Sequence, residues 1–160
     1  MNANPGPLAT RRLILQGAGS VALIGLGFGA MPALAAANDK YPEDAFKQKS
    51  DTDAIKALYG RPHEASDKVK LDAPEIAENG AVVPISVTTT LPNVTSISFL
   101  VAENPNALAA SYKIADGTIP SVANRLKMAK TTNVIAIVEA DGKLYSATKE
   151  VKVTVGGCGG

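Results

Sequence analysis

The sequence nearly lacks cysteine and histidine, the side chains that form disulfides, attach haem and dominate zinc sites. It has one cysteine, Cys158, and one histidine, His63, in 160 residues. A single cysteine cannot form an internal disulfide, and a zinc site or a haem-attachment pair needs more of these residues than the chain contains. A Cys–His couple is not indicated either. We therefore expect no metal, no cofactor and no self-contained active site, and we interpret His63 as a surface residue in a loop.

An excess of charge of one sign is also lacking, since 16 Lys and Arg stand against 15 Asp and Glu. This balance gives no basic surface for nucleic acid, so we expect no nucleic-acid partner. No glycine-rich phosphate-binding loop lies between a predicted strand and a predicted helix. The 46% of hydrophobic residues suits one ordinary globular domain.

The N-terminus carries the pattern of an export signal. Arg11 and Arg12 are followed by a stretch, residues 13–38, that contains no charged side chain. Small residues then provide a cleavage site after Ala35 or, as a second choice, after Ala37. A basic region, an apolar region and a small-residue site in this order predict that residues 1–35 are a cleaved secretory signal.

The stretch Thr10-Arg11-Arg12-Leu13-Ile14-Leu15 resembles the twin-arginine (Tat) export motif. It departs from that motif in having Thr10 for the usual serine, Ile14 for phenylalanine and Gln16 for a common lysine. The resemblance implies export to the periplasm. The alternative is an uncleaved membrane anchor, but five glycines and Pro32 would make a poor membrane-spanning helix. We expect no stable membrane association after cleavage.

The rest of the chain divides into three parts. Residues 36–66 are predicted to hold two short helices, one starting in Tyr41–Lys47 and one over Ala54–Tyr59 that ends at Gly60. Asp51-Thr52-Asp53 is predicted to cap the second helix. We expect these helices to precede the main domain rather than to form part of it. Residues 67–155 are the predicted main domain, and residues 156–160 are a C-terminal arm.

From Val69 onward, apolar residues recur at every second position, the period of a strand with one buried face. Pro84 cannot donate to a strand partner and indicates an edge or a bulge. Asn133–Ala140 is almost continuously apolar, as in a strand buried on both faces, and Asp141-Gly142 predicts a hairpin after it. About seven short strands predict a mainly β, immunoglobulin-like antiparallel β-sandwich. The rows expected to face the core are Val83, Ile85 and Val87; Ile97, Phe99 and Val101; and Tyr145, Ala147, Val151, Val153 and Val155.

The chain ends in an arm that consists of Gly156, Gly157, Cys158, Gly159 and Gly160. Four glycines give the backbone great freedom and remove the side chains around the thiol. An ordinary thiol is mostly protonated at neutral pH, and no basic residue lies close in sequence to activate it. We therefore predict that the arm presents Cys158 to the active site of a partner.

The terminus Val153-Thr154-Val155-Gly156-Gly157-Cys158-Gly159-Gly160 resembles that of the SoxY family, the sulfur-carrier subunits of bacterial thiosulfate-oxidising (Sox) systems. The resemblance continues through residues 73–80, 103–106 and 134–149. It implies that Cys158 is the covalent attachment point of the sulfur substrate and that the carrier is not itself an enzyme. It also implies a heterodimer with a SoxZ-type subunit, which we expect to use edge strands and apolar positions left over on Tyr145–Val155.

The same resemblance implies three visiting enzymes. A SoxAX-type haem enzyme would couple thiosulfate to Cys158 as a cysteine S-thiosulfonate. A SoxB-type hydrolase would release sulfate and leave a persulfide, and a SoxCD-type dehydrogenase, where present, would oxidise the remaining sulfur.

Three other functions are compatible with parts of the sequence. Ubiquitin-like sulfur carriers also end in Gly-Gly, but they act in the cytosol, whereas this chain carries an export signal. An exported structural protein could use Cys158 for an intermolecular disulfide. An isolated redox enzyme would need a resolving cysteine or cofactor ligands, which the sequence lacks.

Overall fold

The computed structural model describes residues 41–154, which form two short helices followed by nine strands. None of the described helices is long and apolar enough to cross a membrane. The elements are α2 (Glu43–Phe46), α3 (Asp51–Tyr59), β1 (Glu64–Ala65), β2 (Val69–Asp72), β3 (Ile76–Ala77), β4 (Val83–Thr89), β5 (Val94–Val101), β6 (Leu108–Lys113), β7 (Ser121–Leu126), β8 (Thr132–Ala140) and β9 (Lys143–Val153).

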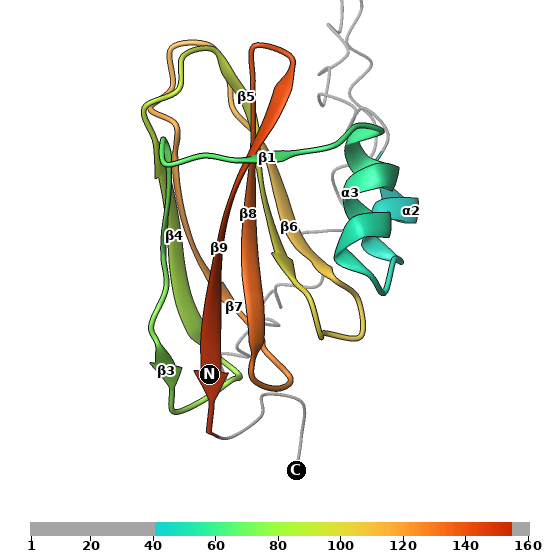
Figure 1. The fold of residues 1–160 in the computed structure, drawn as a ribbon, viewed down its shortest axis with the longest axis vertical. Helices are drawn as coiled ribbons and strands as arrows, with labels where there is room; N and C mark the ends of the chain where they lie inside the picture. Colours follow the sequence, from blue (N-terminus) through green and yellow to red (C-terminus); the bar gives the residue numbers. More distant parts are fainter. Residues whose placement is uncertain (1–40, 155–160) are drawn as a thin grey trace, which may run out of the picture. The chain divides into compact units, whose positions relative to one another are not determined.

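The strands form two facing sheets (Figure 1). The larger sheet has the strand order β1-β9-β8-β5-β6, with β3 also paired to β9, and the smaller sheet has the order β2-β4-β7. All pairings are antiparallel except those of β1 and β3 with β9, which are parallel. This confirms the predicted fold, a mainly β, immunoglobulin-like sandwich preceded by short helices. The two short parallel pairings of β1 and β3 with β9 were not predicted.

The main core lies between the two sheets and is built from the predicted alternating rows. Val83, Ile85 and Val87 of β4 are buried there, as are the apolar residues of β5 at alternate positions. The rings of Phe99 on β5 and Tyr112 on β6 meet edge to face, with centroids 6.3 Å apart. Side chains at every second position of a strand share one face, which explains why the sequence pattern identified this core.

A second core lies on the other face of the larger sheet. Ala45 of α2 and Ala54 and Ile55 of α3 pack there against Leu100 of β5 and Ile137 of β8. Our expectation that the helices lie outside the main domain was therefore wrong, because they cover one face of its larger sheet (Figure 1). The predicted double burial of β8 is confirmed, since one face meets the inter-sheet core and the other meets the helices.

Local sequence signals set several element ends. The side chain of Ser50, one residue before the predicted capping stretch, caps α3 by accepting from the Asp53 amide at 3.3 Å. Gly60 ends the helix with φ of 68°, as predicted for a C-terminal glycine. Asp141 and Gly142 also have positive φ, as the predicted hairpin between β8 and β9 requires. Pro84 pairs with Arg125 of β7 but lies beyond the residues of β4 that pair with β2.

Candidate functional site

The predicted functional residues lie outside the described part of the chain. These are the attachment residue Cys158, the arm glycines Gly156, Gly157, Gly159 and Gly160, and the export residues Arg11 and Arg12. The structure does describe the segment from which the arm extends, Lys152–Thr154, which we call the arm root.

The arm root is fastened to its neighbours on both sides. On the side of β3, the Lys152 amide donates to the Glu75 carbonyl at 2.9 Å and the Thr154 amide donates to the Ala77 carbonyl at 3.1 Å. The Thr154 hydroxyl also donates to the Glu78 carbonyl at 3.0 Å. On the side of β8, the Val153 amide donates to the Thr131 hydroxyl at 2.9 Å. Because backbone and side-chain groups both take part, the chain is held in place as far as Thr154.

The strand that leads to the arm root is also the longest in the structure. β9 has 11 residues and pairs along its length with β8, while β1 and β3 occupy two parts of its other edge. Tyr145, Ala147 and Val153 pack against the inter-sheet core, and Val151 is fully buried in it. Much of this apolar surface is therefore used by the chain's own core, and the expected part of these positions in a subunit interface stays a prediction. Lys149 interrupts the row and donates through Nζ to the Ala73 carbonyl.

Two stretches that carry the family resemblance, residues 73–80 and 103–106, meet near the arm root. The Gly80 carbonyl accepts from the Met128 amide at 2.7 Å. The Asn104 side chain donates to the Lys127 carbonyl at 2.7 Å and accepts from the Ala129 amide at 3.0 Å. Both stretches are thus attached to the loop between β7 and β8, which also contains Thr131. Sequence reasoning missed Thr131, because nothing in the sequence links it to the end of β9.

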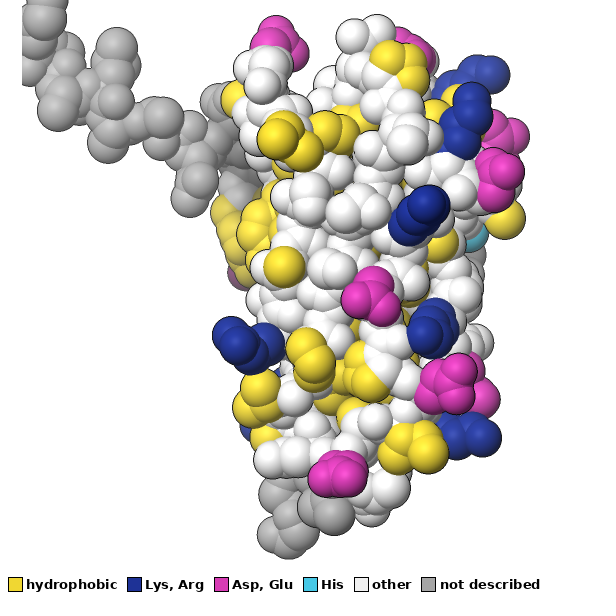
Figure 2. Space-filling view, turned by 90° about the vertical axis from the view of Figure 1, so that its left-hand side faces the viewer, with side chains coloured by type: hydrophobic (Ala, Val, Ile, Leu, Met, Phe, Trp, Pro, Cys, Tyr) yellow, Lys and Arg dark blue, Asp and Glu magenta, His cyan; other side chains and the backbone are white. Residues whose placement is uncertain are grey.

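A groove of about 640 Å³ opens on the smaller sheet, and Figure 2 faces this side of the molecule. Residues of β4 and β7 line it, including Pro84, Ala123 and Arg125, together with the end of β2 and the following Pro74. Pro74 belongs to the segment between β2 and β3, so the groove adjoins the part of the chain that runs beside β9 to the arm root.

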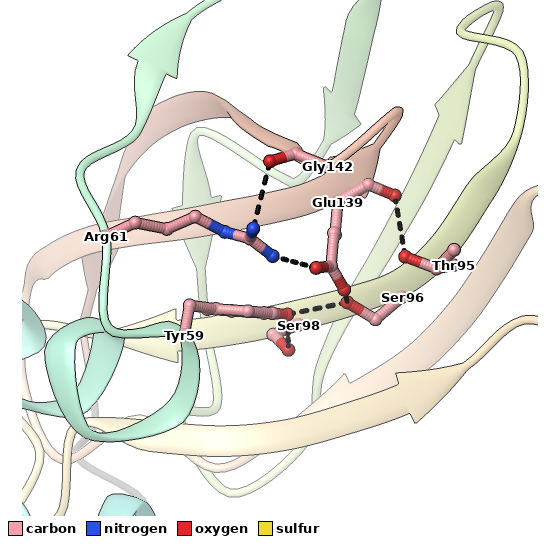
Figure 3. A network of polar contacts seen from close by, with 7 residues as sticks. All are labelled: Tyr59, Arg61, Thr95, Ser96, Ser98, Glu139 and Gly142. Carbon is pink, nitrogen blue, oxygen red and sulfur yellow. Dashed lines mark hydrogen bonds and ion pairs between the residues drawn. The ribbon is translucent and has the colours of Figure 1, made fainter.

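A polar network fastens the end of α3 to the larger sheet (Figure 3). The Tyr59 hydroxyl lies 3.0 Å from Ser96 Oγ and 2.7 Å from Ser98 Oγ. Ser96 donates in turn to the carboxylate of Glu139 at 3.1 Å, and the same carboxylate pairs with Arg61. Burial raises the pKa of Tyr59, the hydrogen bonds to Ser96 and Ser98 act in the opposite direction, and the charge of Glu139 adds to the increase.

Little in the sequence indicates this network. Ser96 and Ser98 alternate with the apolar row of β5, so a strand pattern alone would place them facing solvent, yet both are buried beneath α3. Arg61 also donates to the Gly142 carbonyl, so the network holds the β8–β9 hairpin as well as the end of α3.

His63 lies beside the start of β9, and the arm root lies at the other end of that strand. The Nδ1 atom of His63 is 2.9 Å from Ser146 Oγ, and the His63 ring is otherwise exposed. Within residues 41–154 no group of three or more His, Cys, Asp or Glu side chains is arranged to hold a metal ion.

The sequence model of the family described as "Sulfur oxidation protein SoxY" matches residues 55–158 of the chain, which is more than half of its 160 residues. The chain belongs to the SoxY family. The matched span contains α3 from Ile55 onward and all nine strands, and it ends at Cys158.

A solved structure agrees with this family. The sulfur carrier protein SoxY from Chlorobium limicola f thiosulfatophilum is 44% identical and superposes with a TM-score of 0.59 over 65% of this chain and 96% of that one. A superoxide reductase (neelaredoxin) from Ignicoccus hospitalis is 22% identical, with a TM-score of 0.49 over 54% of this chain and 79% of that one, and is too distant to bear on function. A comparison with curated proteins gave no match.

Membership of the SoxY family gives the protein a role as a carrier in sulfur oxidation rather than as a catalyst. A carrier needs a stable body and an attachment point. The body is the sandwich, and the described chain is fastened to it as far as Thr154, four positions before Cys158.

Proposed function

We propose that the protein carries the sulfur intermediates of thiosulfate oxidation covalently on Cys158. The observation that carries this proposal is the fixed arm root, which ends four residues before the single cysteine of a SoxY-family chain. A chain rises at most about 3.6 Å per residue, so Cys158 lies within roughly 14 Å of Thr154. That length suits the insertion of the thiol into the active site of another protein.

The chemistry begins with the loading of Cys158. The thiolate and the outer sulfur of thiosulfate form a sulfur–sulfur bond and give up two electrons to a haem enzyme of the SoxAX type, leaving a cysteine S-thiosulfonate. A SoxB-type hydrolase then adds water across the bond to the sulfonate group, releasing sulfate and a proton and leaving a cysteine persulfide. The carrier contributes the attachment point, and each enzyme contributes its own catalysis.

A SoxCD-type dehydrogenase would continue the cycle. It would oxidise the outer sulfur of the persulfide to a sulfonate with three water molecules as the oxygen source, passing six electrons to its own acceptor. A second hydrolysis would release sulfate and restore the Cys158 thiol.

We further propose that the protein works in the periplasm as a heterodimer with a SoxZ-type subunit. The signal at Arg11 and Arg12 supports export by the twin-arginine pathway, which moves folded proteins. For the subunit interface, the described sheets offer edge strands β6 and β7, each of which ends its sheet without a neighbour on one side.

The decisive variant is Cys158→Ser. We expect it to fold and to bind the second subunit, because Cys158 lies beyond the last strand, but to abolish turnover in a reconstituted thiosulfate-oxidation assay. Intact mass of the wild-type protein purified from its host should show sulfur adducts on the C-terminal peptide. Turnover by the serine variant at the wild-type rate would refute the proposal, and a loss of folding would point instead to a structural cysteine.

A further inference from the structure

An exposed apolar side chain pairs with the arm root, and a second lies in the turn that precedes β4. Ile76 is 58% exposed and pairs with Lys152 of the arm root, and Val82, just before β4, is 52% exposed. Val82 belongs to the turn that follows Glu78, because its amide donates to the Asn79 carbonyl at 3.3 Å. The Glu78 carbonyl in turn accepts from Thr154. Together with the half-buried Pro74 and the exposed Pro84, these residues form a surface that we call the apolar collar.

We propose that the apolar collar is the docking surface for the enzymes that take up Cys158. This inference rests on the proposed carrier function. An enzyme that accepts Cys158 into its active site must have the mouth of its channel within roughly 14 Å of Thr154, the reach of the four residues between them. The mouth must therefore lie over the arm root and the residues beside it, which include Ile76 and Val82. Figure 2 shows hydrophobic side chains on this side of the molecule, several of them toward the lower end, where β9 ends in Figure 1.

The chemistry of the collar fits a partner that binds and leaves again. The charges beside it are mixed, with the exposed acids Glu75 and Glu78 next to the exposed base Lys152, so no strong field of one sign attracts a partner. Exposed apolar side chains next to a functional segment commonly mark interaction sites. A small apolar patch gives the weak, transient association expected of interfaces below about 1,200 Å². A carrier that visits several enzymes needs such association, because it must be released after each step.

The chain offers a matched control at the other end of the sandwich. Ile119 is 79% exposed and lies between β6 and β7, where the amide of the nearby Ile114 donates to the Thr95 carbonyl at the start of β5. The arm root lies beyond the opposite end of these strands. Ile119→Thr therefore removes the same kind of exposed side chain outside the reach of the arm.

The test compares Ile76→Thr combined with Val82→Thr against Ile119→Thr, each in the full mature chain bound to its second subunit. Threonine keeps the β-branched shape that suits a strand and replaces apolar surface with a hydroxyl group. Cys158 is loaded with tetrathionate, from which the thiolate displaces one thiosulfate and becomes the S-thiosulfonate. The rate of sulfate release by the hydrolase is then measured as the carrier concentration is varied.

We expect kcat/KM of the collar variant to fall by about tenfold, mostly through KM, as for loss of interface anchor residues. The control should keep the wild-type value. Alkylation of Cys158 by iodoacetamide and co-purification with the second subunit should be unchanged in both. An unchanged kcat/KM in the collar variant would overturn the proposal, and so would loss of the second subunit, which would mean that this subunit covers the collar. Failure of the carrier function itself would appear separately, as turnover by Cys158→Ser.

Discussion

The attachment of the helices to the larger sheet can be tested by removing one oxygen atom, in Tyr59→Phe. The Tyr59 hydroxyl is within hydrogen-bonding distance of Ser96 and Ser98, and the ring is partly buried against the second core. Phenylalanine keeps the ring and its packing and removes only these two interactions. The free-energy change therefore reports on the polar contacts alone.

The expected loss follows from the partners that remain. A protein hydrogen bond contributes about 0.5–1.5 kcal/mol net, so two contacts could account for up to about 3 kcal/mol. Neither serine is left without a partner, however, since Ser96 keeps Glu139 and Ser98 keeps Ser111 at 2.9 Å. The variant also no longer buries a polar hydroxyl. We therefore expect the free energy of unfolding to fall by about 1–2 kcal/mol.

Urea unfolding of the mature chain measures this loss, with a lower midpoint and an unchanged dependence on urea concentration. Tyr41→Phe is the control, because the Tyr41 side chain is 59% exposed and a surface change of this kind alters stability by less than about 0.5 kcal/mol. Equal stability of the two variants would refute the assignment of the network. A fall in the free energy of unfolding of more than about 4 kcal/mol would show that the hydroxyl contributes more than its two hydrogen bonds to the serines.

The pH dependence of the same comparison has a definite sign. The pKa of Tyr59 is raised in the folded state, so its stabilising effect is complete below the ordinary tyrosine value of about 10. As pH rises above that value, the unfolded chain loses its proton first and wild-type stability falls, by at most about 1.4 kcal/mol per pH unit for one proton. The phenylalanine variant has no such proton, and all other groups are common to both proteins. The stability difference between the two proteins should therefore shrink as the pH rises above about 10, and a constant difference would contradict the cause given for the raised pKa.

Two predictions concern residues outside the described range. Replacing Gly157 and Gly159 with Val should slow the enzymatic loading and unloading of Cys158 but leave its reaction with a small alkylating reagent nearly unchanged, because β-branched residues stiffen and widen the arm; equal slowing of both reactions would locate the effect at the thiol itself. Changing Arg11-Arg12 to Lys-Lys should leave both this chain and its second subunit in the cytoplasm, as shown by immunoblots of cell fractions, since we predict that the second subunit has no signal of its own; its appearance in the periplasm would rule out co-export.

The sequence predicted those parts of the fold that depend on local signals. The alternating rows of β4 and β5 identified the inter-sheet core, and Asp141-Gly142 identified the hairpin because few residues adopt positive φ at both turn positions. The packing of the helices against β8 could not be predicted in the same way. Its continuous apolar run indicated that both faces are buried, but a strand pattern does not tell which element supplies the second face. Ala54 and Ile55 of α3 form an apolar stripe that is too short to indicate which element it packs against.

The candidate site was likewise predictable from the sequence only in part. The glycines and Cys158 could be singled out from composition alone, since the sequence contains a single thiol and sets it between two glycine pairs. The contacts that fix the arm root could not be predicted from the sequence. β3 has only two residues, and its pairing with β9 depends on where the preceding segment runs. Thr131 likewise contacts Val153 only because two strand ends meet in space.

The position of the fixed root has a consequence for how the carrier works. A longer free segment would give the thiol a wider reach but would lower its effective concentration at a docked enzyme, which falls as a tether grows beyond the span it must bridge. Pairing of β9 with β3 through Ala77, together with the bond from Thr154 to Glu78, fastens the chain as far as Thr154, which leaves four positions to Cys158. The surfaces beside that root then decide which partners come within reach. Under the proposed function, the end of the longest strand therefore sets both the range of Cys158 and the place where an enzyme would bind to use it.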